Sequence, residues 1–216
     1  MNKLPASPLI YLITDRQQFT PHHHRQLEAI AAAAQAGCQL IQIREKDLSV
    51  RELCEFVHAA LAQAKPHGAR VLVNDRLDVA LAMGADGVHL RTNSLPVAEI
   101  RRLVPRLDFL VGVSTHSLTE AQAAAASGAD FIVCGPVFPT PSKASYGAPL
   151  GLDRCEEICR AVNVPVLALG GLTMNNFAEP LSRGAAGIAA ISLFKNVASL
   201  GSNIKIVLSS RLTPQD

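Results

Sequence analysis

The segment Ala82-Met83-Gly84-Ala85-Asp86-Gly87 decides the fold, because it recurs along the chain in the same local setting. Residues 126–131 (Ala-Ser-Gly-Ala-Asp-Phe) and 182–187 (Ser-Arg-Gly-Ala-Ala-Gly) are close copies, and residues 35–38 are a weaker fourth. In each copy a helix-forming stretch reaches a glycine, which adopts the left-handed backbone of a helix end at little energetic cost. An apolar run follows at once. The repeat therefore predicts helices that return directly into strands.

Apolar, β-branched runs alternate with Ala-, Leu- and Glu-rich stretches of helical spacing along the chain. The expected strands are residues 9–14, 40–44, 70–74, 87–90, 110–114, 131–134, 165–169 and 187–192. The expected helices are residues 23–36, 50–65, 77–83, 97–103, 118–127, 152–161, 175–183 and 194–209. Strands that are apolar on both faces and are joined through helices form a parallel sheet.

Eight such units favour a closed barrel over an open doubly wound sheet. An open sheet of that kind would carry a glycine fingerprint after its first strand, whereas Thr14-Asp15-Arg16 stands there. No composition shift marks a linker. We therefore expect an α/β protein with a single (β/α)8 TIM-barrel domain over residues 1–216.

Composition narrows the function classes. Hydrophobic residues make up 49% of the 216 residues and charged residues 18%, which indicates a large core and argues against disorder. The net charge of +2, the low aromatic content of 4% and the lack of Trp argue against a nucleic-acid partner. No apolar run has the length of a membrane helix, and the first residues lack the pattern of a signal peptide.

The five cysteines are odd in number and scattered, which is typical of a reduced cytoplasmic protein. Cys155 and Cys159 share a helix face, but no CxxC pair or His partner completes a metal set, so we interpret them as core residues. The expected protein is soluble and cytoplasmic, with no nucleic-acid or membrane partner, and it could form a homodimer.

Polar groups follow nearly every expected strand, at the barrel face where catalytic sites form. Arg44 and Lys46 follow the second strand, and Lys143 follows the sixth, so this face predicts a cationic pocket suited to pyrophosphate. Asn74 and Ser114 add neutral donors. Burying these groups at the opposite, stability face would be costly without partners.

Asp75 allows two interpretations. A carboxylate beside phosphate-binding groups is a typical Mg²⁺ ligand, but Asp75 also stands where it could cap the helix that begins near Leu77.

Two further segments suggest a second anion site. The loop at residues 134–143 carries two hydroxyls and a lysine among a glycine and three prolines. Gly170-Gly171 and Ile191-Ser192 follow the last two strands, where barrels often bind phosphate, and a tight turn is the alternative explanation for the glycines. Two anion sites on one face suggest two phosphorylated substrate halves.

The histidines are less informative. His22-His23-His24 is interpreted as a solvated helix start, because three adjacent residues cannot all face one metal. His89 and His116 are candidate proton carriers, or else buried imidazoles with hydrogen-bond partners.

Taken together, several segments in this order resemble the thiamin phosphate synthase superfamily over essentially the whole chain. They are residues 11–15, 41–46, 74–76, 84–90, 112–116, 135–143 and 191–192. The resemblance implies that the protein is a transferase of thiamin biosynthesis. In this family a hydroxymethylpyrimidine pyrophosphate is joined to a thiazole phosphate and pyrophosphate is released.

The resemblance also implies residue roles. The positions that match the pyrimidine pyrophosphate site are Gln42, Arg44, Lys46, Asn74, Ser114 and Lys143, and Glu45 is grouped with them. Those that match the thiazole phosphate site are Thr140, Ser142, Gly171, Ile191 and Ser192. Asp75 matches one Mg²⁺ ligand, and Arg44, Lys46 and Lys143 are the expected catalytic cations.

One segment departs from the family. After Gly-Val-His-Leu the synthases usually continue Gly-Gln-x-Asp, whose Asp is a second Mg²⁺ ligand, whereas this chain has Arg91-Thr92-Asn93-Ser94. Losing a carboxylate should weaken a Mg²⁺ site, and Arg91 could instead contact the pyrophosphate. The same departure suits two alternatives, a thiazole phosphate tautomerase, in which His89 or His116 would carry the proton, and a non-catalytic phosphate-ligand binder. Against the tautomerase, the chain has Pro136 where one type of tautomerase has a histidine.

Overall fold

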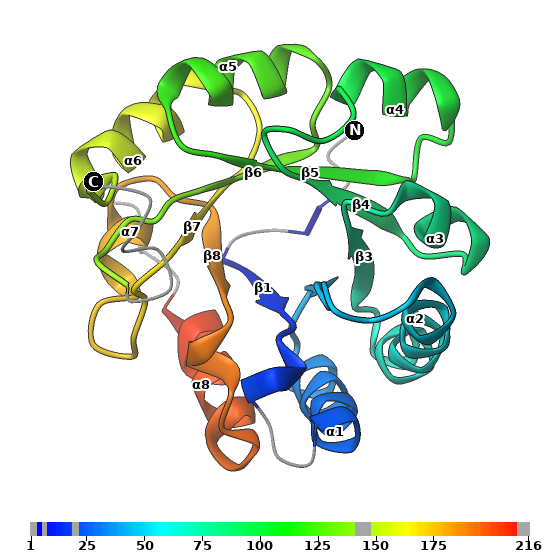
Figure 1. The fold of residues 1–216 in the computed structure, drawn as a ribbon. Helices are drawn as coiled ribbons and strands as arrows, with labels where there is room; N and C mark the ends of the chain where they lie inside the picture. Colours follow the sequence, from blue (N-terminus) through cyan, green and yellow to red (C-terminus); the bar gives the residue numbers. More distant parts are fainter. Residues whose placement is uncertain (1–3, 6–7, 19–21, 141–147, 211–216) are drawn as a thin grey trace.

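The computed structural model describes residues 4–5, 8–18, 22–140 and 148–210. In this part of the chain, eight parallel strands close into a barrel in sequence order, and the helices form a ring outside it (Figure 1). The closure joins the first and last strands, with Leu9 opposite Gly187. The predicted (β/α)8 barrel is therefore confirmed, while the assignment of one domain to residues 1–216 stays a prediction.

The strand and helix bounds follow the expected order. The strands are β1 (Leu9–Ile13), β2 (Leu40–Ile43), β3 (Arg70–Asn74), β4 (Gly87–Leu90), β5 (Leu110–Thr115), β6 (Phe131–Cys134), β7 (Val166–Leu169) and β8 (Gly187–Ala190). The α-helices are α1 (His22–Gln35), α2 (Val50–Ala64), α3 (Leu77–Ala82), α4 (Val97–Leu103), α5 (Leu118–Ala126), α6 (Gly151–Ala161), α7 (Ala178–Ser182) and α8 (Val197–Ser209). Short 3-10 helices are η1 (Arg16–Gln18), η2 (Lys65–His67) and η4 (Ser192–Phe194).

Most bounds lie within one residue of the expected ones, and two regions differ by more. The last strand was expected to reach residue 192 but ends at Ala190, and the last helix was expected from residue 194 but begins at Val197. The 3-10 helix η4 (Ser192–Phe194) lies between them. The seventh helix begins only at Ala178, because the Asn176 side chain accepts the Thr173 N–H at 2.7 Å and holds the preceding residues in a turn.

The repeated glycine joints are confirmed. All three glycines have positive φ, namely +64°, +95° and +94° at Gly84, Gly128 and Gly184. The aspartates that follow have a role that the sequence did not reveal. The Asp86 carboxylate accepts the Val71 N–H at 2.8 Å, and the Asp130 carboxylate accepts the Val111 N–H at 2.7 Å. Each aspartate thereby ties the start of its strand to the preceding strand.

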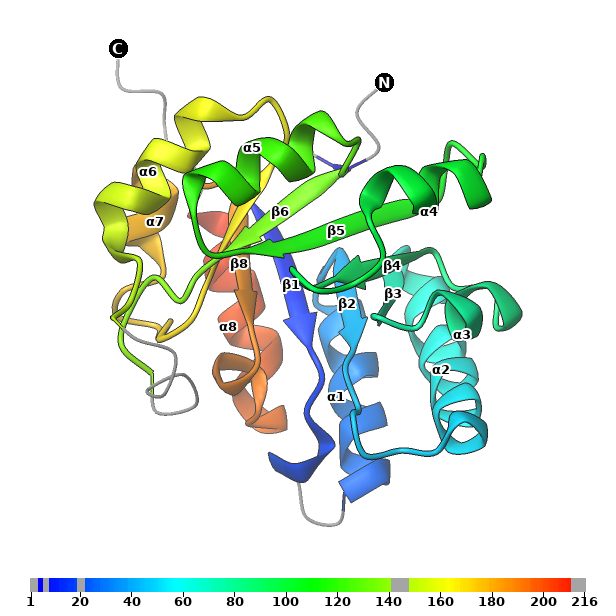
Figure 2. The same ribbon diagram turned by 45° about the horizontal axis from the view of Figure 1, so that its top comes forward.

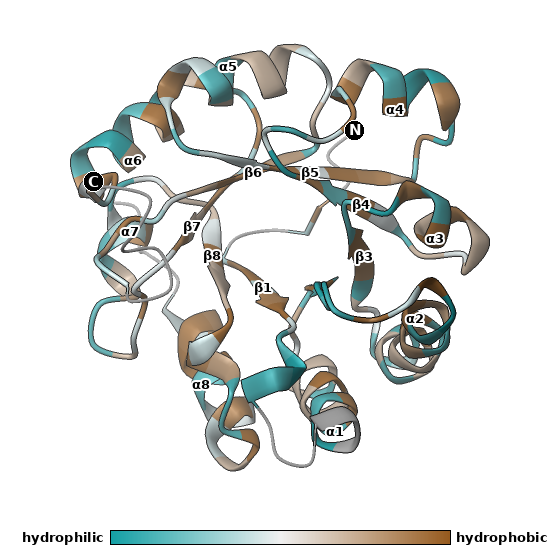
Figure 3. Cartoon of the chain, in the orientation of Figure 1, coloured by the Kyte–Doolittle hydropathy of each residue, from teal (hydrophilic) through white to brown (hydrophobic). Residues whose placement is uncertain are grey.

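The apolar residues form two layers. Brown strands and the inward faces of the helices meet between barrel and ring, and teal residues gather on the outer faces (Figure 3). Inside the barrel, the Tyr11 and Phe131 rings lie edge to face with centroids 5.3 Å apart. A Cβ at Gly112 would lie 2.3 Å from the Phe131 ring, so glycine on β5 makes room for this ring.

Cys155 is a buried core residue, as predicted, and Cys159 is partly buried and packs against the core. The Sγ atoms of Cys134 and Cys155 are 3.2 Å apart between β6 and α6. The hydrogen bond with Cys134, together with burial, raises the pKa of Cys155 to about 12, and burial raises the pKa of Cys38 to about 12. These thiols stay protonated at neutral pH and pack as small hydrophobic groups. No helix among the described residues has the length and apolar character needed to cross a membrane.

Candidate active site

A cationic hollow lies at the carboxyl ends of β2, β3 and β4, on the side of the barrel where the strand arrows point (Figure 2). It has a volume of about 310 Å³, close to the small end of ligand sites in proteins. Its lining consists of Ile43, Glu45, Lys46, Leu48, Leu53, Asn74, Asp75, Arg76 and Arg91. Lys46 and Asn74 were expected here from the sequence. Arg76 was missed, although it belongs to the Asn74-Asp75-Arg76 segment.

A glycine hollow of about 80 Å³ lies at the ends of β6, β7 and β8. Its lining consists of Pro136, Thr140, Leu169, Gly170, Gly171, Leu172, Ala189, Ala190, Ile191 and Ser192. Gly171 has φ +66°, and a Cβ there would lie 2.6 Å from Phe138 Cβ and from the Pro139 carbonyl. Gly171 therefore makes the tight turn, as one interpretation of the sequence predicted, and it also lines the hollow, while its role in binding phosphate stays a prediction.

Gln42, His89 and Ser114 belong to the ends of β2, β4 and β5. The His89 Nε2 atom lies 2.8 Å from Ser114 Oγ. The buried Gln42 side chain interacts with the Tyr11 hydroxyl inside the barrel. His89 Nδ1 is buried and has no hydrogen-bond partner among the described residues, and because buried polar groups normally have partners, this atom is a candidate to bind a polar ligand.

The electrostatics of His89 are those of a neutral imidazole. Burial, followed by the nearby positive charge of Arg44, lowers the pKa of His89 to about 3. At neutral pH the ring therefore carries no charge and can donate one hydrogen bond and accept another. In this neutral state the His89 ring forms a hydrogen bond with the Ser114 hydroxyl and thereby orients it.

Arg44 and Glu45 are positioned by Thr14, which follows β1. The Thr14 hydroxyl accepts the Arg44 N–H at 2.9 Å. The buried Glu45 carboxylate accepts the Arg16 backbone N–H at 3.2 and 3.1 Å to its two oxygens. Burial raises the pKa of Glu45, against the opposing hydrogen bonds from Thr14 and Arg16. Glu45 therefore couples the loops after β1 and β2 and also lines the cationic hollow.

His116 follows β5 and is exposed. Its Nδ1 atom lies 2.5 Å from the Gly135 carbonyl, and its backbone N–H donates to Glu120 at 2.7 Å. The ring is thus tied to the start of the loop after β6. Ser142 and Lys143, the other two expected ligands in that loop, lie outside the described residues, as do the side chains of His22-His23-His24 at the start of α1.

Asp75 lies at the rim of the cationic hollow in a left-handed backbone conformation, with φ +62°. It does not cap α3, whose N-cap is Arg76 without a side-chain hydrogen bond. Arg91 Nη2 donates to one Asp75 carboxylate oxygen, and Ser94 Oγ donates to the other. Partial burial acts to raise the pKa of Asp75, but the hydrogen bonds from Ser94 and Arg91 and the Arg91 charge outweigh it, and the pKa is lowered.

These residues do not fit a magnesium ion. Mg²⁺ needs an octahedral set of oxygen ligands, mostly carboxylates, phosphates and water. Both Asp75 oxygens already accept hydrogen bonds, from Arg91 and from Ser94, and the guanidinium charge would repel a second cation at that carboxylate. No group of three or more His, Cys, Asp or Glu residues suited to a metal occurs in the described part of the chain.

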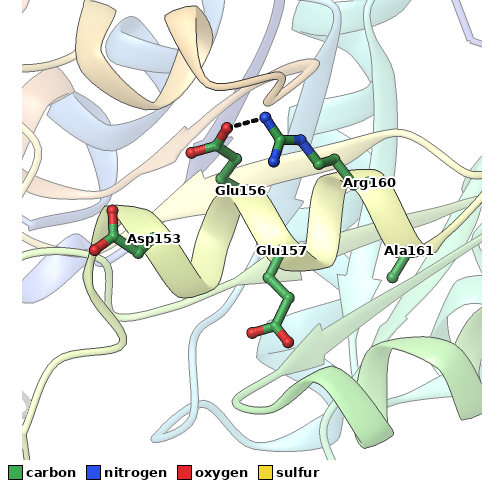
Figure 4. A pocket seen from close by; sticks show the side chains of 5 residues that line it. All are labelled: Asp153, Glu156, Glu157, Arg160 and Ala161. Carbon is green, nitrogen blue, oxygen red and sulfur yellow. Dashed lines mark ion pairs between the residues drawn. The ribbon is translucent and has the colours of Figure 1, made fainter.

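A more open hollow of about 500 Å³ lies along α6, away from the strand ends (Figure 4). It is lined by Asp153, Glu156, Glu157, Arg160 and Ala161, and Glu156 pairs with Arg160 at 2.5 Å one helical turn away. Such i,i+4 pairs are typical of a solvated helix face. This hollow is therefore no candidate for the active site.

Comparisons with known proteins show the family and the fold of this chain. The family model described as thiamine monophosphate synthase matches residues 10–194. A thiamine-phosphate synthase from Methanoculleus marisnigri is 44% identical over 85% of this chain and 85% of its own length. One from Chlorobium luteolum is 42% identical over 87% of this chain and 85% of its own length.

A solved structure adds the same result at the level of the fold. The thiamine phosphate pyrophosphorylase from Pyrococcus furiosus superimposes with a TM-score of 0.79 and 33% identity, covering 96% of this chain and 98% of its own. The match spans the barrel and both hollows. The chain therefore belongs to the thiamine monophosphate synthase family.

Proposed function

We propose that this protein is a transferase that joins hydroxymethylpyrimidine pyrophosphate to thiazole phosphate and releases pyrophosphate, in thiamin biosynthesis. One observation carries the proposal. Of the residues that the family resemblance assigns to the pyrimidine pyrophosphate, Lys46 and Asn74 line one hollow. Of those assigned to the thiazole phosphate, Thr140, Gly171, Ile191 and Ser192 line a second hollow on the same barrel face. Two anionic substrates need two such sites.

The chemistry suits these residues. The bond between the pyrimidine methylene carbon and the pyrophosphate oxygen breaks heterolytically, and both bonding electrons leave with the pyrophosphate. The cationic methylene then takes the lone pair of the thiazole nitrogen to form the new C–N bond. No proton needs to move to a side chain. The protein has to stabilise the departing charge and hold both partners in line.

Arg44, Lys46 and Lys143 are the proposed catalytic cations at the leaving group. The hydrogen bonds from their guanidinium and ammonium groups to the pyrophosphate oxygens would become stronger as negative charge develops on those oxygens in a site with little water. His89 Nδ1 is a buried polar atom without a partner among the described residues, which a nitrogen of the pyrimidine ring would satisfy. Ser114 is oriented by His89 and is proposed to donate to the pyrophosphate.

The relatives named above are synthases, which favours this function over the tautomerase and over the non-catalytic binder. A cytoplasmic location and a homodimer remain predictions of this proposal.

A kinetic test separates these functions. Purified protein is incubated with both substrates, and pyrophosphate and the coupled product are quantified together. Lys46→Met is expected to lower kcat/KM by about a hundredfold, from the loss of one charge-assisted contact made to the transition state. Lys205→Met, which removes an exposed lysine on α8, is the matched control and is expected to react as the natural protein does. Equal activity of the two variants would contradict the assigned role of the cationic hollow.

A further inference from the structure

We propose that the Arg91 guanidinium, held on Asp75, is the pyrophosphate-binding cation at the position where the family's sequence pattern implies a divalent metal. The inference rests on the proposed function only in naming pyrophosphate as the anion. It concerns the segment Arg91-Thr92-Asn93-Ser94, where the family has Gly-Gln-x-Asp.

The first argument is the arrangement of the three side chains. Arg91 and Ser94 both donate to the Asp75 carboxylate, one to each oxygen. The Arg91 backbone N–H donates to Ser94 Oγ at 2.7 Å, and the Ser94 N–H donates to the Arg91 carbonyl at 3.1 Å. The turn after β4 is thus closed by its own two residues, and both of them are fixed to the end of β3.

The second argument is the position of Asp75. Its left-handed backbone conformation is unfavourable for a residue other than glycine. The Asp75 N–H also donates to the His89 carbonyl at 2.8 Å, so the residue is tied to β4 through its backbone as well as its side chain. Such strained residues occur where the surrounding structure needs a side chain in one place. Here the side chain positions Arg91.

The third argument is the number of donors that remain. A guanidinium has five N–H donors, and the contact with Asp75 is made by Nη2. Arg91 lines the cationic hollow together with Lys46 and Asn74, and 44% of its side chain is exposed to solvent. The planar fork can therefore bind two oxygens of a pyrophosphate while it stays anchored. Ser94 matches this role, because an aspartate there would compete with Asp75 for the guanidinium.

Because the Arg91 guanidinium takes the place of a metal ion, pyrophosphate binding is expected not to depend on a divalent metal. In calorimetry with inorganic pyrophosphate alone, the natural protein is expected to bind equally well, within about threefold, in EDTA and in Mg²⁺. Arg91→Ala is expected to weaken binding in EDTA by about tenfold to a hundredfold, the loss of a charge-assisted hydrogen bond. Arg91→Lys keeps the charge but loses the fork, and an intermediate loss is expected. Arg102→Ala, which removes an exposed arginine of α4, is the matched control.

The reciprocal variant restores the glycine and the aspartate of the family pattern. Arg91→Gly combined with Ser94→Asp removes the guanidinium and adds a carboxylate beside Asp75. This variant is expected to take up Mn²⁺, read by electron paramagnetic resonance, and to bind pyrophosphate only when a divalent metal is present. The natural protein is expected to leave Mn²⁺ free in the same titration.

Three results would overturn the proposal. The first is that the natural protein binds pyrophosphate tenfold or more weakly in EDTA than in Mg²⁺. The second is that Arg91→Ala binds pyrophosphate as tightly as the natural protein does, and the third is that the natural protein takes up Mn²⁺. Because inorganic pyrophosphate is the only ligand used, these results do not depend on whether the coupled product forms. Failure of the synthase reaction with intact, Arg91-dependent binding would reject the proposed function and leave this inference standing.

Discussion

Replacing Gly171 with alanine tests how closely the glycine hollow is built. Two effects add at this position. An alanine at φ +66° costs about 1–2 kcal/mol for the left-handed backbone. Its Cβ would also lie 2.6 Å from Phe138 Cβ and from the Pro139 carbonyl, and such overpacking costs about 1–3 kcal/mol. The total expected loss in free energy of unfolding is about 2–5 kcal/mol.

Gly84→Ala is the matched control, because Gly84 has φ +64° and no atom lies within 4 Å of the added Cβ. Only the backbone cost of about 1–2 kcal/mol is expected there. For a domain of this size, 1 kcal/mol shifts Tm by about 2–4 °C, so we expect Tm to fall by about 2–8 °C for Gly84→Ala and about 4–20 °C for Gly171→Ala.

The assay combines thermal unfolding with binding of the thiazole phosphate. Gly171→Ala is also expected to raise the Kd for thiazole phosphate by at least about tenfold, because relief of the contact moves the loop after β6. Gly84→Ala is expected to bind as the natural protein does. If the two variants unfold at the same temperature and bind equally well, the close approach of these loops is refuted.

Three further predictions concern the barrel itself. Because burial lowers the pKa of His89 to about 3, the folded state binds this proton less tightly than the unfolded state, so its stability contribution is present above pH 6.5 and is lost as the pH falls towards 3. Between these pH values His89 should lower the free energy of unfolding by about 1.4 kcal/mol per pH unit, and His89→Gln should abolish this part of the pH dependence, measured by urea unfolding at several pH values. The same pH dependence of the unfolding free energy in both proteins would contradict a buried neutral ring. Gly112→Ala places a Cβ 2.3 Å from the Phe131 ring and should lower the unfolding free energy by about 1–3 kcal/mol, whereas Phe131→Leu in the same chain should recover part of the loss; additive losses in denaturant melts would argue against the contact. Asp130→Ala should cost about 1–3 kcal/mol, because it leaves the Val111 N–H without an acceptor and Arg101 without its carboxylate partner. Asp130→Asn keeps an acceptor oxygen for Val111 and should lose less; equal losses in the two variants would show that the ion pair with Arg101, and not the bond to Val111, carries the stability.

The fold could be predicted because its signals are local. The glycine joints at Gly84, Gly128 and Gly184 reveal helix ends, and apolar runs reveal the strands that follow. Parallel strands that are joined through helices can be connected in only a few topologies, and eight such strand–helix units favour a closed barrel. The start of α7 was missed because a single side chain, Asn176, ends the turn before it, and hydropathy does not report such a bond.

The site could be predicted only in part. Which strand ends carry polar groups is visible in the sequence, and so is the departure at Arg91 and Ser94. The sequence does not show that Asp75 adopts a left-handed backbone and accepts hydrogen bonds from both. Nor does it show that the His89 ring has a pKa of about 3, since this depends on burial between strands distant in sequence.

The most direct test of the central claim is the stoichiometry of the reaction. Purified protein is mixed with hydroxymethylpyrimidine pyrophosphate and thiazole phosphate, and the coupled product and pyrophosphate are measured over the same time course. Transfer between two hollows on one face predicts one pyrophosphate for each coupled product, and no product without the thiazole phosphate. Folded protein that binds both substrates but forms no coupled product would contradict the account.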